Sequence, residues 1–125
     1  MRLSLLLPLA AAASPALADT LPLARGAYVE RGDACADAPN AVIRRYDGQG
    51  IGSSKVGRCT GRVLVHIRRR YTLRQNCEQY GDPRGRRFRA TDNVKVRVDG
   101  RTSFTDLKTG THYRLCPGLH PASRS

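Results

Sequence analysis

Arginine is the residue type in this chain best suited to binding chemistry, and much of it falls in two dense groups. One group follows an alternating apolar stretch, and the other lies in a segment rich in Gly and Pro. The candidate residues are Arg68, Arg69, Arg70, Arg74, Arg84, Arg86, Arg87 and Arg89. A guanidinium group keeps its charge at biological pH and binds carboxylate or phosphate through two parallel hydrogen bonds. We therefore predict that these eight side chains bind anions.

The overall charge also favours an acidic partner. The 125-residue chain has 22 basic and 10 acidic residues, which gives a formal net charge of +12. Such an excess is larger than solubility requires and would steer the protein toward an anionic polymer or an acidic protein. A GC-rich genome would raise the arginine content too, so composition leaves both explanations open. No helix or ribbon that could read base edges is evident, so sequence-specific nucleic acid binding is not expected.

The four cysteines predict two disulfides. Cys35, Cys59, Cys77 and Cys116 are widely spaced and form no CxxC pair, so structural disulfides fit the pattern better than a zinc site does. We favour the connectivity 59–77 with 35–116, and 35–59 with 77–116 is the alternative. In the chain-entropy model the two favoured bridges would stabilise the fold by about 3 and 4.5 kcal/mol.

Residues for enzyme chemistry are few. Glutamate occurs only at Glu30 and Glu78, and the chain has no HExxH, GxSxG or paired-carboxylate pattern. The stretches Gly85–Arg89 and Thr111–Tyr113 resemble pieces of the small secreted bacterial ribonucleases. That resemblance implies a glutamate base and a histidine acid, but Ala90 stands at the position of the glutamate. We therefore predict no catalytic residue, no cofactor and no metal site.

The first residues are typical of a secretory signal peptide. A basic start is followed by a short apolar run and by small residues of the kind that a signal peptidase recognises. The run is too short to span a membrane, and no later segment is apolar enough to do so. We expect residues 1–18 to be removed and residues 19–125 to form a single domain exported to the periplasm or the extracellular space.

Strands are the elements that must position the arginines. Between residues 59 and 77, apolar and polar residues alternate on both sides of an Arg68–Arg70 turn, which is the period of a half-buried strand. A reversal centred on Arg68 gives the pairs Val63 with Leu73, Val65 with Tyr71, and Cys59 with Cys77. This register buries the apolar residues and brings the two sulfurs within disulfide distance.

A second hairpin is predicted over residues 93–106. A three-residue turn would pair Val98 with Thr102 and Val96 with Phe104, with Gly100 in a left-handed bulge. This choice of turn keeps Phe104 on the same face as the valines. Phe104 is therefore predicted to lie in the core.

The remaining pattern predicts an all-β fold. Further strands are expected near residues 27–30, 42–46, 87–91 and 112–116, with a long loop at 78–87 and no convincing helix. Seven or eight short strands and two disulfides favour a small antiparallel barrel or a strongly curved sheet, with a β-sandwich as the alternative. Tyr71, Tyr80 and Phe88 are expected to pack in the core rather than to stack on bases or sugars.

Three functional hypotheses follow from these features. The first is an exported, non-enzymatic domain that binds an acidic partner, either an anionic envelope polymer or an acidic protein, through its arginine clusters. The second is an inhibitor of a secreted hydrolase, which needs only a rigid scaffold that holds out a loop such as 78–87. The third is a small secreted ribonuclease or another hydrolase. The sequence gives no indication of the oligomeric state.

Overall fold

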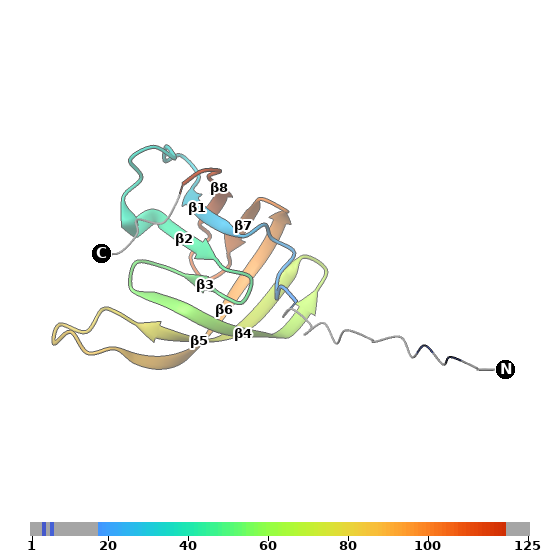
Figure 1. Cartoon of the computed structure of the whole chain (residues 1–125). Coiled ribbons are helices and arrows are strands. Elements are labelled where there is room, and N and C mark those ends of the chain that lie inside the picture. The colour runs from blue at the N-terminus through green and yellow to red at the C-terminus, as the bar shows by residue number, and fades with distance from the viewer. Residues whose placement is uncertain (1–3, 5, 7–17, 120–125) are drawn as a thin grey trace.

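The chain folds into one curled antiparallel β-sheet in the computed structural model, which describes residues 4, 6 and 18–119. The strand order is β3-β2-β1-β8-β7-β6-β5-β4, and the two end strands approach each other so that the sheet is a nearly closed barrel (Figure 1). The prediction of an all-β barrel-like fold is confirmed. The predicted signal peptide, residues 1–18, lies outside the described residues except for positions 4, 6 and 18.

Three of the eight strands are much longer than the others. The elements are β1 (Gly26–Glu30), η1 (Asn40–Val42, a single 3-10 turn), β2 (Ile43–Tyr46), β3 (Ile51–Gly52), β4 (Val56–Ile67), β5 (Arg70–Gln79), β6 (Phe88–Gly100), β7 (Ser103–Asp106) and β8 (His112–Leu115). Strands β4, β5 and β6 have 12, 10 and 13 residues, although short strands were predicted. The segments expected as two strands, 87–91 and 93–99, form one continuous β6, because β5 pairs with it without a break.

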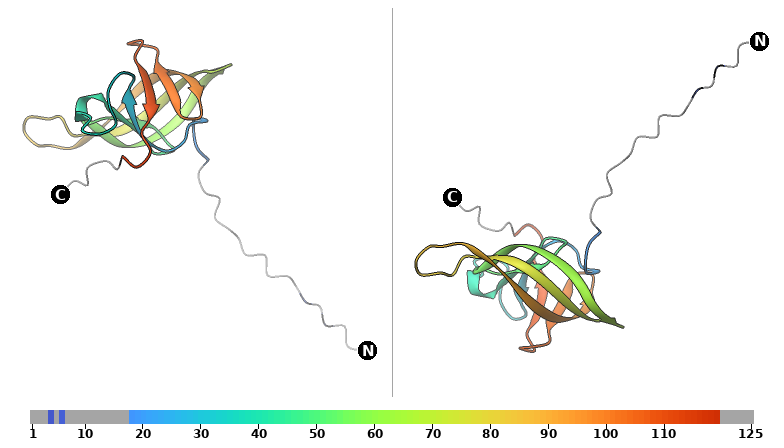
Figure 2. Two further views of the ribbon diagram at one scale, coloured as in Figure 1. Left: turned by 90° about the horizontal axis from the view of Figure 1, so that it is seen from above. Right: turned by 90° about the horizontal axis from the view of Figure 1, so that it is seen from below.

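The long strands form a curved ribbon across one side of the molecule, and the short strands complete the barrel on the other side (Figure 2). The ribbon ends in the β4–β5 turn at one end and in the loop 80–87 at the other. No helix among the described residues is long and apolar enough to cross a bilayer.

Aromatic side chains fill the barrel interior. The largest fully buried residues of this interior cluster are Tyr28, Tyr46, Phe104, Leu23, Leu73 and Val96. Phe104 packs against Tyr28 edge to face and against Tyr113 in a stack, with ring centroids 5.2 and 5.0 Å apart. Burial raises the pKa of Tyr28 to about 12, so its hydroxyl stays protonated and donates to the Ala24 carbonyl at 2.6 Å.

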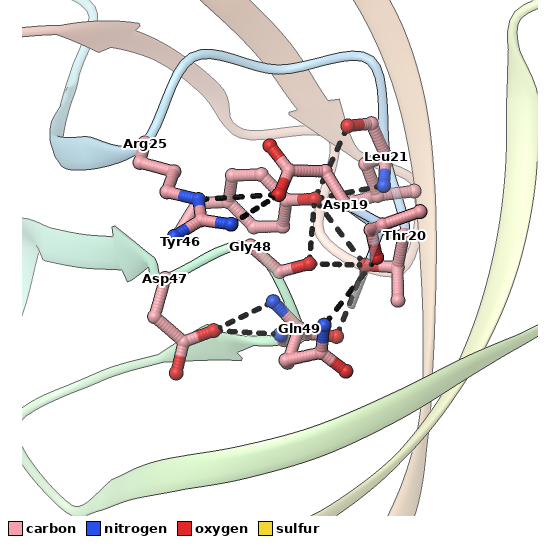
Figure 3. A network of polar contacts seen from close by, with 10 residues as sticks. Asp19, Thr20, Leu21, Arg25, Tyr46, Asp47, Gly48 and Gln49 are labelled. Carbon is pink, nitrogen blue, oxygen red and sulfur yellow. Dashed lines mark hydrogen bonds and ion pairs between the residues drawn. The ribbon is translucent and has the colours of Figure 1, made fainter. Parts of the chain in front are cut away.

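The segment before β1 closes one end of this core, although its sequence shows no alternating pattern. Leu21 and Leu23 are both buried in the core cluster. The Tyr46 hydroxyl accepts a hydrogen bond from the Leu21 N–H (2.8 Å) and donates to the Leu21 carbonyl (3.1 Å), as Figure 3 shows. Because the buried Tyr46 hydroxyl bonds both the Leu21 N–H and the Leu21 carbonyl, this irregular segment can be buried there at little cost in lost hydrogen bonds.

Both disulfides have the favoured connectivity. Cys35 is bonded to Cys116 and Cys59 to Cys77, with Cα–Cα distances of 5.6 and 4.1 Å. The first bridge belongs to a small second cluster formed by Ala27, Val29, Ile43 and Cys116 on the outside of β1 and β2. The prediction of the disulfides is therefore confirmed.

The sheet closes where its end strands β3 and β4 meet, a region that we call the seam. Gln75 of β5 is only 4 % exposed. Its side-chain oxygen accepts a hydrogen bond from the Ile51 N–H, and its side-chain nitrogen donates to the Ile51 carbonyl, both at 2.9 Å. Gly50 and Gly61 allow the close approach, because a Cβ on Gly61 would overlap the Gln49 carbonyl. A side chain thus replaces a missing strand neighbour for β3.

The predicted β4–β5 register is correct only in its middle. Val63 lies opposite Leu73 as expected, but a bulge follows, and Val65 lies opposite Thr72 rather than Tyr71. The extra residue is Leu64, which sequence alternation cannot reveal because it is as apolar as its neighbours. Since one inserted residue reverses the faces of the strand, Val65 is on the outer face and not in the core.

The β6–β7 hairpin contains a similar correction. Val98 lies opposite Phe104 and Val96 opposite Asp106, so the predicted pairs Val98–Thr102 and Val96–Phe104 are wrong. The shift arises between Val98 and Gly100, and Gly100 does not have the predicted left-handed backbone. The bulge still leaves Phe104 facing the core, as predicted.

Of the three aromatic residues expected in the core, one is clearly outside it. Tyr71 packs against the core cluster, and Tyr80 is half-buried. Phe88, at the start of β6, is 53 % exposed. The prediction for Phe88 is wrong because β6 begins beyond the barrel, where no short strand covers it.

Closure by Gln75 gives the first testable prediction. Replacing Gln75 with Met keeps the length of the side chain but leaves the Ile51 N–H and carbonyl buried without partners. Because each unpaired buried group costs about 1 to 3 kcal/mol, we expect the free energy of unfolding to fall by roughly 3 kcal/mol in urea titrations. Gln79→Met is the matched control, since Gln79 on the same strand bonds only the nearby Cys77 carbonyl. Equal losses in the two variants would contradict the role of Gln75.

Candidate anion-binding face

The eight predicted arginines do not form one cluster. Arg68, Arg69 and Arg70 lie at the β4–β5 turn, whereas Arg84, Arg86 and Arg87 lie in the loop between β5 and β6. These two places are at opposite ends of β5, a ten-residue strand that is about 30 Å long at the usual rise per residue. Arg74 and Arg89 lie between them on β5 and β6. No single anion can therefore contact both predicted groups.

Two of the three loop arginines are already paired with acidic residues. Arg87 lies 3.5 Å from the Glu78 carboxylate, and Arg86 lies 3.4 Å from that of Asp82. Exposed pairs of this kind contribute little to stability, but they reduce the positive charge that a ligand would meet.

Arg89 is also engaged. Its guanidinium donates to the Asn76 side-chain oxygen at 2.5 Å and to the Asn76 and Arg58 carbonyls at 2.8 and 2.9 Å. These bonds fix Arg89 across three strands. Its side chain therefore supports the sheet more than it offers charge to a ligand.

Two arginines without an ion-pair partner lie side by side on the outer face of β4 and β5. Arg62 is directly opposite Arg74 in the strand register, and neither side chain has an acidic or hydrogen-bonding partner among the described residues. Lys95 of β6, opposite Thr72, follows on the same face. We call this surface, with Arg62, Arg74 and Lys95, the basic face. Like charges directly opposite each other on a sheet repel, and an anion bound between them would remove that repulsion.

A shallow depression of about 210 Å³ lies on the basic face. Its lining residues are Thr60, Gly61, Arg62, Arg74, Asn76 and Thr91. Two guanidinium groups and the Thr60 hydroxyl supply hydrogen-bond donors, and no carboxylate lines the depression. This is the donor set that phosphate, sulfate or carboxylate groups require.

Arg62 is the functional candidate that the sequence reasoning missed. It stands alone in the sequence, so a search for arginine clusters passes over it. The signal was nevertheless present, because the predicted Val63–Leu73 pair places Arg62 opposite Arg74. A further signal is the absence of acid: residues 48–77 contain seven basic and no acidic side chains.

Two larger depressions offer less charge. One, of about 520 Å³, lies under the loop 80–87 and contains Phe88 and the paired Arg86 and Asp82. The other, of about 500 Å³, lies beside the segment before β1. Its carboxylate, Asp19, is already paired with Arg25. In both depressions, few lining side chains could donate hydrogen bonds to the same anion.

A polar cluster on the outside of β6, β7 and β8 includes His112. The Thr105 hydroxyl donates to the Asp99 carboxylate at 2.6 Å and lies 2.7 Å from His112 Nδ1. Arg97 donates to the other Asp99 oxygen at 2.6 Å. In a nucleophilic triad the imidazole stands between the hydroxyl and the carboxylate. Here the hydroxyl stands between the other two groups and is 4 % exposed, so the cluster is arranged to join three strands.

The cluster determines how Asp99 titrates. Burial acts to raise the pKa of this carboxyl, but hydrogen bonds from Thr105 and Arg97 and the charge of Arg97 outweigh it. The pKa of Asp99 is therefore lowered from its ordinary value of 3.8. A lowered pKa means that the ionised carboxylate stabilises the folded chain above that ordinary value.

This sign gives a prediction for acid unfolding. The stabilisation from Asp99 should be lost as the pH falls through its folded pKa. We expect Asp99→Asn to lower the free energy of unfolding by about 1 to 2 kcal/mol at pH 7, and the difference from the wild type to shrink below pH 4. Urea unfolding at a series of pH values measures it, with Asp37→Asn, an exposed loop carboxylate, as the control. A difference that stays constant down to pH 2 would refute the assignment.

Comparison of the chain with protein-family models, with curated proteins and with solved structures finds no match. In the described part of the chain, no group of three or more His, Cys, Asp or Glu side chains could hold a metal ion. The basic face is the feature on which the functional proposal below is based.

Proposed function

We propose that this protein is an exported, non-enzymatic binding domain for an anionic polymer, and that the Arg62–Arg74 pair is the centre of its binding face. The observation that carries the proposal is the direct opposition of these two arginines, neither of which has an ion-pair partner among the described residues. The strand pairing places the two arginines directly opposite each other, so that both guanidinium groups can reach the same anionic group and bind it through charge-assisted hydrogen bonds.

The shape of the face favours a polymer over a single small anion. Arg74 and Lys95 lie on neighbouring strands of an extended ribbon, and the Arg68–Arg70 turn continues the positive charge beyond its end. A chain with repeated phosphate, sulfate or carboxylate groups can contact several of these positions at once. Such binding gains affinity from each contact.

The compartment is consistent with such a ligand. The two disulfides are consistent with an oxidising environment. Anionic polymers of the envelope would be accessible to an exported protein. Acidic proteins of the same compartment are the alternative ligand class and would be attracted by the same charge.

Dextran sulfate is a suitable probe polymer, and its affinity is measured by titration calorimetry at several salt concentrations. We expect the double variant Arg62→Ala/Arg74→Ala to bind at least about tenfold more weakly, which corresponds to about 1.4 kcal/mol. The dependence of log Kd on log salt should also become shallower, because fewer counterions are released.

The matched control removes the same charge elsewhere, in Arg31→Ala/Arg84→Ala. We expect this variant to keep most of the affinity and the original salt dependence. Equal losses in both double variants would show that net charge alone attracts the polymer. Binding that does not respond to salt would refute the proposal altogether.

A further inference from the structure

Three large apolar side chains are exposed close together at the end of β4. Leu64, Val65 and Ile67 are 44 %, 45 % and 64 % exposed. They lie in the hairpin tip, residues 64–70, which projects past the short strands at the end away from the loop 80–87 (Figure 2). Exposed apolar groups gathered in this way on a soluble domain mark an interaction surface.

The fold itself turns these side chains outward. Beyond the Leu64 bulge, Val65 lies opposite Thr72 and Ile67 opposite Arg70, both on the outer face of β5. Without the bulge, Val65 would face Tyr71 and the core. His66 takes the inner position instead and stacks on Tyr71 with ring centroids 4.1 Å apart. The outward position of the apolar groups is therefore built into the register and is not a frayed strand end.

Arginines surround the apolar group. On one side of this group, Arg62 and Arg74 lie on the basic face. On the other side, at the end of the hairpin, Arg68, Arg69 and Arg70 form the turn. None of the three turn arginines has a side-chain partner among the described residues. His66 Nε2 lies 2.8 Å from the Arg68 carbonyl and so helps to hold the turn in shape.

This combination selects one kind of ligand. A soluble polyanion would contact the arginines but leave the apolar side chains in water. A self-complementary contact between two copies would place arginines against arginines. An anionic lipid surface offers phosphates to the guanidinium groups and a hydrocarbon boundary to the apolar groups.

We propose that the hairpin tip docks on a bilayer surface that contains anionic phospholipid. Leu64, Val65 and Ile67 enter the boundary between headgroups and acyl chains, and Arg68–Arg70 bind the lipid phosphates. The proposal rests on the proposed function for its electrostatic attraction and adds an apolar contact that a polymer does not use. The barrel stays in water, because only the projecting tip carries this group.

The chain contains no tryptophan, so a tryptophan placed at the tip reports its own surroundings. In the Ile67→Trp variant, we expect a blue shift of emission with vesicles of phosphatidylglycerol and phosphatidylcholine, and quenching by brominated lipid in the same vesicles. Phe88→Trp is the control at the other end of the ribbon and should show neither change. No blue shift at position 67, or equal shifts at both positions, would overturn the proposal.

A second set of variants separates lipid docking from polymer binding. We expect Leu64→Ser/Val65→Ser/Ile67→Ser to lose at least about tenfold in affinity for the phosphatidylglycerol vesicles and to keep the wild-type affinity for dextran sulfate. Phe88→Ser should change neither affinity. If the triple variant keeps its vesicle affinity, or loses both affinities while still folded, the lipid proposal fails.

The outcomes for the wild type are also distinct. Binding to dextran sulfate without binding to the vesicles would leave the proposed function standing and refute the docking. Binding to vesicles of phosphatidylcholine alone, at the same strength, would refute the role of the lipid charge. Binding of an acidic extended peptide that competes with the vesicles and depends on Leu64, Val65 and Ile67 would assign the tip to a protein partner instead.

Discussion

The two hydrogen bonds between the Gln75 side chain and the Ile51 backbone hold the two ends of the sheet together. Strand β3 is only two residues long, and its ladder bonds run to β2. On its other side, a buried amide from β5 provides the donor and the acceptor that a neighbouring strand would provide. This exchange costs little, because a side-chain amide has the same hydrogen-bonding groups as a peptide. The seam depends on these two bonds, since the Ile51 N–H and carbonyl would otherwise be buried without partners, at a cost comparable to that of lost hydrogen bonds.

Closure of the barrel also determines where basic side chains can lie. The interior is formed by tyrosines, by Phe104 and by the leucines of the segment before β1, and an unpaired charged side chain buried among them would be costly. Basic residues of the long strands must therefore lie on the outer face or at the ends. Because Val63 and Leu73 pair on the inner side of the ribbon, Arg62 and Arg74 lie directly opposite each other on its outer side. The packing of the core thus determines the position of the Arg62–Arg74 pair on the outer face.

Sequence reasoning was sufficient where one strong constraint acted over a short range. The disulfide pairing and the burial of Leu73 and Phe104 followed from alternation and from the need to keep apolar groups on one face. It failed at Leu64, where a single extra residue reverses the strand faces, and it gave the wrong pairs in the β6–β7 hairpin, although Phe104 still faces the core. A bulge of this kind leaves no trace in composition, because an inserted leucine looks like any other strand residue. The bulge at Leu64 exposes Val65. The bulge between Val98 and Gly100 changes the pairing around Phe104.

The candidate site was predictable in residue type but not in position. Arginine clusters in the sequence marked both ends of the ribbon, and ion pairs with Glu78 and Asp82 reduce the charge at one of them. Arg62 stands alone in the sequence and belongs to the site only because the strand register places it opposite Arg74. Gln75 gave no signal at all, because a polar residue among apolar ones on the inner face is read as an interruption. Its partner, Ile51, is 24 residues away in the sequence.

If anionic groups bind between β4 and β5 on the basic face, amide chemical-shift mapping by NMR will locate them there. During a titration with dextran sulfate in low salt, the largest shifts are predicted at the amides of residues 60–62 and 74–76, with smaller changes at 93–95. The amides of β1 and β2 on the opposite side of the barrel should not move. Largest shifts in the loop 84–87, or shifts spread evenly over the surface, would contradict this account.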